Sequence, residues 1–130
     1  MGKVLRDIWI LTETGLTVFS RAIDPRVNPQ LFGGLMSALN MFAENLSEGG
    51  MTNFELSNIR FTIVKKNQFL FIANSSNQFK IKKVLNELKI ISKKFFKIYP
   101  EEIIRSFNTN LKVFADFENY IIDSLEEVSS

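Results

Sequence analysis

The longest periodic stretch of the chain runs from Asn28 to Gly50, where apolar and polar positions recur with the spacing of an amphipathic α-helix. Asn28 is a suitable N-cap because its side-chain oxygen can accept a hydrogen bond from a free backbone N–H one turn on. Pro29 fits the first helical position, which needs no N–H donor, and the final glycines favour a C-terminal cap. The stripe expected to be buried consists of Phe32, Leu35, Leu39, Phe42, Ala43 and Leu46.

Two glycines, Gly33 and Gly34, interrupt this helix, and each costs about 1 kcal/mol relative to alanine. The pair indicates a close approach by another backbone, which could belong to this chain or to a partner; the sequence leaves both open. Gly34, Ser37 and Met41 are expected on the side away from Leu39, where they would form a flat strip of small, weakly polar residues. We therefore expect a partner interface on that strip.

Five segments have the alternating or continuously apolar pattern of β-strands. The stretch from Ile8 to Leu11 is apolar at every position, which is typical of a strand that is covered on both faces. Gly15 supplies the positive φ angle of the turn that joins the first two strands. The strands are expected over residues 4–11, 16–23, 52–56, 59–64 and 69–73.

The last third of the chain has helical periodicity. A second long helix is expected over residues 78–99, a short one from Pro100 to Phe107, since proline is tolerated in a first turn, and a last one from Leu111 to Val128. Thirteen phenylalanines indicate a core dominated by aromatic packing, each ring contributing about 1.5–3 kcal/mol when buried. The element order is therefore β-β-α-β-β-β-α-α.

This order predicts an α+β fold in one domain that spans residues 1–130. The economical arrangement is a five-stranded antiparallel sheet. The helix of residues 28–50 would cover one face, and the C-terminal helices would cover the other.

The sequence also contains segments that carry a family resemblance. They are DIWILTETGLTVFSR at residues 7–21, FGGLMSALNMFAENL at 32–46, IRFTIVKKNQFLFIANSS at 59–76 and LKVFADFENYI at 111–121. With the element order, these packing patterns resemble longin domains of the longin/roadblock superfamily, and in particular archaeal longin-like proteins. Because the chain begins directly with a strand, the pattern favours longin over roadblock relatives, which usually begin with a helix.

The resemblance implies a non-catalytic scaffold or adaptor in small-GTPase regulation or in vesicle and membrane trafficking. It implies a small GTPase, a SNARE-type helix or another longin or roadblock domain as the partner, and it allows a homodimer. It implies no cofactor.

The charge distribution adds a second hypothesis. The net charge is only +2, but residues 65–97 hold nine lysines and a single acidic residue, Glu87, whereas residues 98–130 hold two basic and seven acidic side chains. Such a division describes surfaces and partners rather than the fold.

On the second long helix, one face is rich in lysine and lies opposite Leu88, with Ile90 among the lysines. This face can be merely solvated. It can instead bind an anionic membrane, at about 1 kcal/mol per lysine, or an acidic protein anchored on Ile90. Nucleic acid is the least favoured partner, because no exposed aromatic platform or arginine accompanies the lysines. The residues of this basic face are Lys82, Lys83, Ile90, Lys93, Lys94 and Lys97.

The residues that usually carry chemistry are scarce. The chain has no histidine and no cysteine, which removes the usual proton shuttle, thiolate nucleophiles and the standard zinc sites. Asp116 and Glu118 are two positions apart and do not face each other on a helix. We therefore expect no catalytic, cofactor or metal site, and no enzyme. The longest apolar run, Phe69–Ala73, is far shorter than a membrane span, so we expect a cytoplasmic protein, at most peripheral to a membrane.

Overall fold

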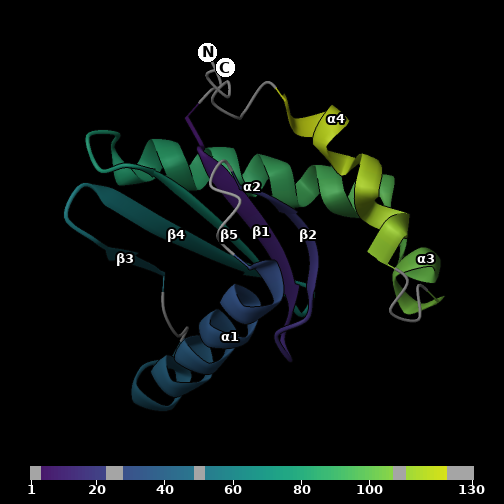
Figure 1. The fold of residues 1–130 in the computed structure, drawn as a ribbon, viewed down its shortest axis with the longest axis horizontal. Helices are drawn as coiled ribbons and strands as arrows, with labels where there is room; N and C mark the ends of the chain where they lie inside the picture. The colour runs from purple at the N-terminus through teal and green to yellow at the C-terminus, as the bar shows by residue number, and fades with distance from the viewer. Residues whose placement is uncertain (1–3, 23–27, 49–51, 107–110, 123–130) are drawn as a thin grey trace.

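The computed structural model describes residues 4–22, 28–48, 52–106 and 111–122. Its centre is a five-stranded antiparallel sheet with the strand order β2-β1-β5-β4-β3 (Figure 1). This arrangement confirms the predicted fold class and the number of strands. The strands are β1 Asp7–Thr12, β2 Thr17–Arg21, β3 Asn53–Glu55, β4 Ile59–Lys66 and β5 Phe69–Ser76.

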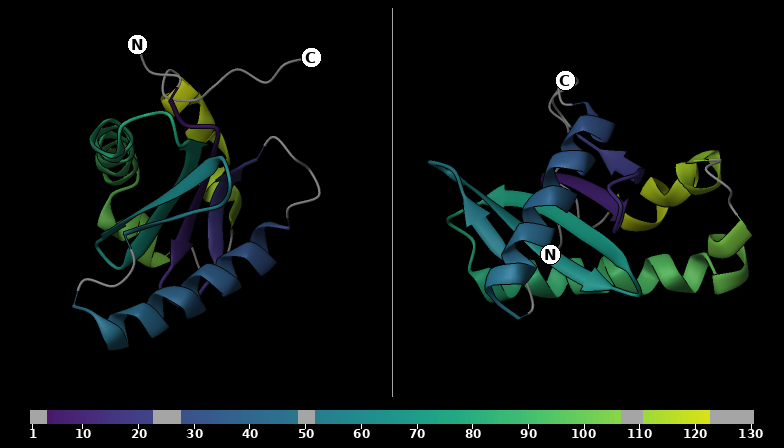
Figure 2. Two further views of the ribbon diagram at one scale, coloured as in Figure 1. Left: turned by 90° about the vertical axis from the view of Figure 1, so that its left-hand side faces the viewer. Right: turned by 90° about the horizontal axis from the view of Figure 1, so that it is seen from below.

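The helices cover both faces of the sheet. Helix α1 crosses one face, and α2 runs along the other together with the C-terminal helical segments (Figure 2). This division into layers also agrees with the prediction from the element order. The helical elements are α1 Pro29–Leu46, α2 Ile81–Ile98, α3 Glu101–Ser106, the 3-10 helix η1 Leu111–Phe117 and α4 Glu118–Ile121.

Each face of the sheet has its own hydrophobic cluster. Beneath α1, Trp9 stacks on Phe32 with ring centroids 4.1 Å apart, and Phe61 lies 6.1 Å from Trp9. Beneath α2, Phe95 is fully buried and contacts six other aromatic rings. The aromatic core expected from the phenylalanine content is thus divided between two layers, with the central strands β1 and β5 buried between them.

One predicted element differs from the structure. The chain from Leu111 does not begin as an α-helix but as the 3-10 helix η1, and α4 follows for one turn. Side chains three positions apart line up in a 3-10 helix, so Phe114 and Phe117 both point at Phe95, at centroid distances of 5.4 and 5.2 Å. The packing of both rings on Phe95 therefore favours the 3-10 helix over the predicted α-helix. The rest of the predicted helix, from residue 123 on, lies outside the described residues.

Candidate interaction surfaces

Helix α1 is fixed to the sheet at its first turn. Asn28 caps it as predicted, because its Oδ1 accepts from the backbone N–H groups of Gln30 and Leu31 at 3.0 and 3.1 Å. The side-chain amide of Gln30 pairs with the backbone of Thr17, accepting from its N–H and donating to its carbonyl oxygen, both at 2.9 Å. Gln30 thus bonds to the outer edge of β2 as a neighbouring strand would, and this contact fixes where α1 starts.

The paired glycines of α1 have different environments. Gly33 faces the β1–β2 turn so closely that a Cβ at this position would lie 2.6 Å from the carbonyl oxygen of Gly15. Gly15 itself has φ of +97°, a conformation that glycine adopts at little cost. A Cβ at Gly34, in contrast, would meet no heavy atom within 4 Å. The close backbone approach is therefore internal and involves Gly33 alone, while Gly34 faces open space.

This contact determines which face of α1 is buried. The inward side consists of Gly33, Met36, Ser37 and Asn40. Ser37, predicted to lie on the outer strip, is only 5% exposed, and its hydroxyl donates to the carbonyl oxygen of Glu13 at 2.5 Å. The prediction of an outward Ser37 is wrong because the Gly33 contact turns its neighbour one turn on toward the same loop.

The predicted buried stripe of α1 is mostly exposed. Phe32 and Ala43 are partly buried, but the other four members face outward. These four residues were predicted to face the core. That prediction is wrong, because the contact of Gly33 with the β1–β2 turn places them on the side of α1 away from the sheet. The exposed members are Leu35 (58%), Leu39 (39%), Phe42 (64%) and Leu46 (73%), and Leu31 (75%) and Met41 (60%) extend the same apolar surface.

We call this surface the α1 apolar face: Leu31, Leu35, Leu39, Met41, Phe42 and Leu46. A run of large exposed hydrophobic side chains along one helix is unusual in a monomeric protein. Such an apolar surface commonly marks an interaction site. Of the residues predicted for a partner interface, Gly34 and Met41 lie on the outside and Ser37 does not. The glycine pair at the helix end, residues 49–50, lies outside the described residues.

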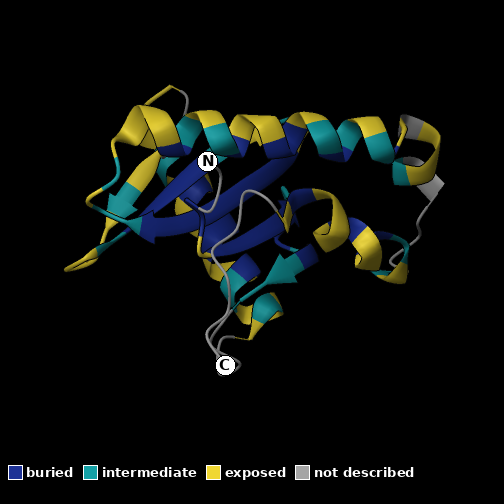
Figure 3. Cartoon of the chain, turned by 90° about the horizontal axis from the view of Figure 1, so that it is seen from above, coloured by how far each residue is buried: buried dark blue, intermediate teal, exposed yellow. Residues whose placement is uncertain are grey.

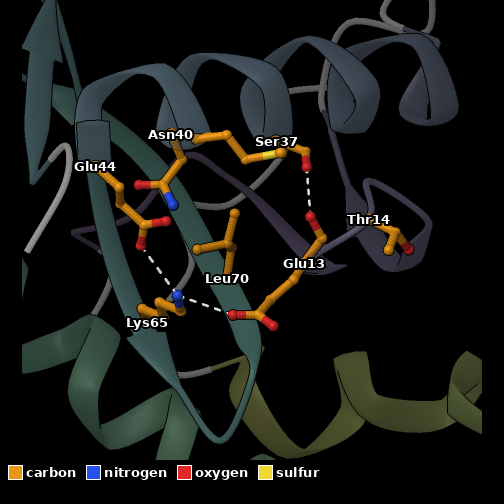
Figure 4. A pocket seen from close by; sticks show the side chains of 8 residues that line it. Glu13, Thr14, Ser37, Asn40, Glu44, Lys65 and Leu70 are labelled. Atoms are coloured by element: carbon orange, nitrogen blue, oxygen red, sulfur yellow. Dashed lines mark hydrogen bonds and ion pairs between the residues drawn. The ribbon is translucent and has the colours of Figure 1, made fainter. Parts of the chain in front are cut away.

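A hollow of about 530 Å³ lies between α1 and the end of the sheet that holds the β1–β2 turn and the β4–β5 turn (Figure 4). At its mouth, Lys65 Nζ lies 2.8 Å from Glu13 Oε1 and 3.0 Å from Glu44 Oε2. The hydrogen bond to Glu13, followed by that to Glu44, raises the pKa of Lys65, and the hydrogen bond from Lys65 lowers the pKa of Glu44. The hollow is lined by Glu13, Thr14, Ser37, Asn40, Met41, Glu44, Lys65 and Leu70.

Several polar groups of this hollow bond to other elements of the chain and so stabilise the fold. Lys65 ties together the β1–β2 turn, α1 and β4, so its charge is matched by two carboxylates. Ser37 is bound to the Glu13 carbonyl oxygen. Among the residues that the structure describes, no group of three acidic, histidine or cysteine side chains is placed to hold a metal ion.

The basic side of α2 is placed largely as the sequence predicts. The buried side of the helix consists of Val84, Leu88, Ile91, Ser92 and Phe95, and the opposite side is exposed (Figure 3). The exposed side holds five of the predicted residues, and Lys89, which was not among them, lies there too. The five are Lys82, Lys83, Ile90, Lys93 and Lys97.

One predicted member of the basic face differs. Lys94 is half-buried, and its Nζ donates to the carbonyl oxygen of Tyr120 at 3.2 Å. It therefore joins α2 to α4. That contact comes from a segment distant in sequence, so the helical spacing alone could not reveal it.

The two carboxylates considered in the last helical segment also have structural partners. Tyr99 is buried, and its hydroxyl donates to Asp116 Oδ1 at 2.7 Å. Burial, reinforced by the carboxylate of Asp116, raises the pKa of Tyr99. Glu118 Oε2 lies 3.9 Å from Arg21 Nε, an ion pair between α4 and the edge strand β2. Both residues thus connect the C-terminal segment to the rest of the fold.

Comparison with known structures identifies this architecture. The chain is similar to Myxococcus xanthus MglB, with a TM-score of 0.60 and 14% sequence identity over 73% of this chain and 83% of that one. The chain shares its fold with this structure, in agreement with the fold that the resemblance implied. A Roadblock/LC7 domain from Streptomyces avermitilis is also similar, with a TM-score of 0.56 and 14% identity over 74% of this chain and 85% of that one. No family profile and no curated protein sequence matches the chain.

These likenesses confirm the resemblance drawn from the sequence at the level of the fold. One of the two structures is named as a Roadblock/LC7 domain, whereas the strand at the start of the sequence had favoured longin relatives. Within the described residues, the chain has no helix that combines the length and the apolar character needed to span a membrane.

Proposed function

We propose that the chain is a non-catalytic interaction domain that pairs with a second copy of itself through the α1 apolar face. The observation that supports this most directly is the exposure of Leu35, Phe42 and Leu46 on the outside of a well-anchored helix. Burying such side chains contributes about 1.5–3 kcal/mol each. In a monomer these side chains stay in contact with water, whereas packing against a partner helix would bury them and stabilise the assembly.

The composition of α1 favours a second copy as the partner. Between Pro29 and Leu46 the helix has only one charged residue, Glu44, which is engaged by Lys65. In a two-fold interface the same surface patch of each copy meets its counterpart. Because the α1 apolar face carries no charge, two copies of it can pack together without electrostatic repulsion. Gly34 and Ala38 lie on the exposed side, and their small size lets two helices approach closely.

The neighbouring edge of the sheet supports the same arrangement. Strand β3 forms one edge, and in the described part of the chain no strand pairs with its outer side. Exposed strand edges are templates for pairing with another chain. Pairing of β3 with its counterpart would extend the sheet while the two α1 helices meet.

The proposed cellular role is supported by the family resemblance. Longin and roadblock domains commonly serve as platforms for small GTPases, and the similarity to MglB and to a Roadblock/LC7 domain supports that class of fold for this chain. We propose that the self-associated domain is a scaffold or adaptor in small-GTPase regulation or membrane trafficking. The GTPase would bind outside the α1 apolar face, because the second copy occupies it.

Sedimentation equilibrium tests the self-association. The wild-type chain is expected to dimerise. The double variant Leu35→Glu with Phe42→Glu is expected to yield folded monomers, because dimerisation would bury both new charges without a partner of opposite charge. Ile122→Glu is the matched control: Ile122 is 58% exposed but lies at the end of α4, in the opposite layer. A wild-type chain that stays monomeric at every accessible concentration would contradict the proposal.

A further inference from the structure

The outer side of α2 is a second surface, on the face of the sheet opposite α1 (Figure 2). Five exposed residues form one line along the helix because they follow one another at intervals of three or four positions: Lys83, Asn86, Ile90, Lys93 and Lys97. Lys82 and Lys89 flank this line and are also exposed. We call these seven residues the α2 basic face. It has five lysines, one amide and one apolar side chain, and no acidic residue.

The α2 basic face is held in a fixed, extended shape. The opposite side of the helix packs into the core through Val84, Leu88, Ile91 and Phe95, all of them fully buried. Eighteen residues of α-helix span about 27 Å. Helix α2 runs along one side of the molecule with its exposed side outward (Figure 3), and the lysines of the α2 basic face belong to that exposed side.

We propose that the α2 basic face docks on an anionic lipid membrane, with the lysines at the lipid headgroups and Ile90 at the level of the upper acyl chains. Ile90 is 46% exposed and lies within the line of lysines, about 20° around the helix axis from both Lys83 and Lys97. The apolar stripe of α2 is already buried in the core, so this face would bind through its lysines, with Ile90 as its one apolar side chain.

Charge complementarity favours a lipid surface over the other polyanions. Residues 65–97 contain lysine but no arginine, and lysine acts as a point charge without the bidentate geometry that suits specific phosphate or base recognition. The α2 basic face has no aromatic side chain on which a nucleobase could stack. Lysine is also depleted at protein–protein interfaces, whose centres are apolar and aromatic. A planar anionic membrane needs only a row of positive charges.

The rest of the chain would orient the molecule on such a membrane. Residues 98–130 carry two basic and seven acidic side chains, and residues 1–64 carry five basic and six acidic ones. The net positive charge of the chain is therefore concentrated in residues 65–97, and the α2 basic face is the side expected to turn toward the lipid. Self-association through α1 would leave this face open in both copies.

Vesicle flotation tests the proposal. The full chain is mixed with vesicles of phosphatidylcholine alone, or of phosphatidylcholine with phosphatidylserine, over a series of salt concentrations. Binding is expected only to the anionic vesicles, and it should weaken as salt rises, because the Debye length falls below about 10 Å above 0.1 M ionic strength. The variant Lys83→Gln with Lys97→Gln should bind about fivefold more weakly for each lysine removed.

Two controls separate a docking face from general charge. Lys66→Gln with Lys112→Gln removes the same charge from β4 and η1, outside the α2 basic face, and should weaken binding much less. Ile90→Ser should weaken binding without changing its salt dependence, because it removes an inserted side chain and no charge. Circular dichroism and the thermal midpoint check that every variant is folded. Leu35→Glu should keep the lysine dependence, since α1 is on the other layer.

Four outcomes would overturn the proposal. They are equal binding to neutral and anionic vesicles, no binding to either, equal losses in the two double-glutamine variants, and binding of duplex DNA or poly-glutamate at the affinity seen with anionic vesicles. DNA binding would assign the face to nucleic acid. Poly-glutamate binding would assign it to an acidic protein.

Discussion

Gly33 of α1 lies against Gly15 of the β1–β2 turn, with the carbonyl oxygen of Gly15 2.6 Å from the position where a Cβ of residue 33 would be. This single backbone contact sets the rotation of α1 about its own axis. It places Met36, Ser37 and Asn40 against the sheet and leaves Leu35, Phe42 and Leu46 outside. The α1 apolar face, which we propose for self-association, is thus exposed because of a contact made on the other side of the same helix.

Gly33→Ala and Gly34→Ala are therefore expected to have opposite effects. Alanine at residue 33 would clash with Gly15 and Thr17, and overpacking of this kind costs about 1–3 kcal/mol, more than the gain in helix propensity. Alanine at residue 34 meets open space and should stabilise the helix by up to about 1 kcal/mol. Urea denaturation measures both free energies of unfolding. Equal effects of the two substitutions would show that α1 is rotated differently.

Phe32 and Phe42 provide a second matched pair on α1. Phe32 stacks on Trp9 at 4.1 Å, whereas Phe42 is 64% exposed. Phe32→Ala is expected to cost about 3 kcal/mol, and Phe42→Ala to stay within about 0.5 kcal/mol, when both are made in the Leu35→Glu background to remove assembly.

Fluorescence provides an independent check of the same pair, because Trp9 is the only tryptophan of the chain. Its emission should shift to longer wavelength in folded Phe32→Ala, where water reaches the indole, and should not move in Phe42→Ala. A shift in the second variant alone would reverse the assignment of the two faces.

The ion pairs of Lys65 should give the stability a pH dependence. The pKa of Glu44 is lowered by the hydrogen bond from Lys65, so this contribution is present above the ordinary value of 4.5 and is lost as pH falls through the lower, folded-state pKa. Lys65→Met removes the bond at every pH. The difference in unfolding free energy between wild type and Lys65→Met should be small, because these groups are solvated, and should shrink below pH 4.5. A difference that grows on acidification would contradict this assignment.

Tyr99 gives a prediction at the other end of the pH scale. Loss of its hydrogen bond to Asp116 in Tyr99→Phe should cost about 1.5–3 kcal/mol at neutral pH, since the acceptor is a carboxylate. Because burial raises the pKa of Tyr99 in the folded chain, its contribution is complete below the ordinary value of 10.0 and declines as pH rises beyond it. Wild type should therefore lose more stability than Tyr99→Phe above pH 10.0 in alkaline denaturation. Parallel curves would mean that the folded-state pKa is not raised.

The element order, the layers and the Asn28 cap could be predicted because they depend on local patterns: periodicity, turn residues and capping. The rotation of α1 could not be predicted, because apolar residues occur on both sides of this helix and the choice between them depends on Gly15, eighteen positions before Gly33. The basic side of α2 could be predicted because a helix with one strongly apolar stripe has only one way to pack. Lys94 is the exception, since its partner Tyr120 lies in a different helix.

The bond between Gln30 and Thr17 has a consequence for the size of any assembly. The amide of Gln30 occupies the backbone groups of Thr17 at the outer edge of β2, and Arg21, farther along that strand, is paired with Glu118. Among the described residues, a side chain of α1 therefore occupies the outer edge of β2 where that strand begins, whereas no strand pairs with the outer edge of β3. If two copies pair through β3, each uses the edge that is open, and the Gln30 amide opposes the addition of a further strand at the start of β2. This side-chain contact therefore acts against edge-to-edge growth beyond two chains.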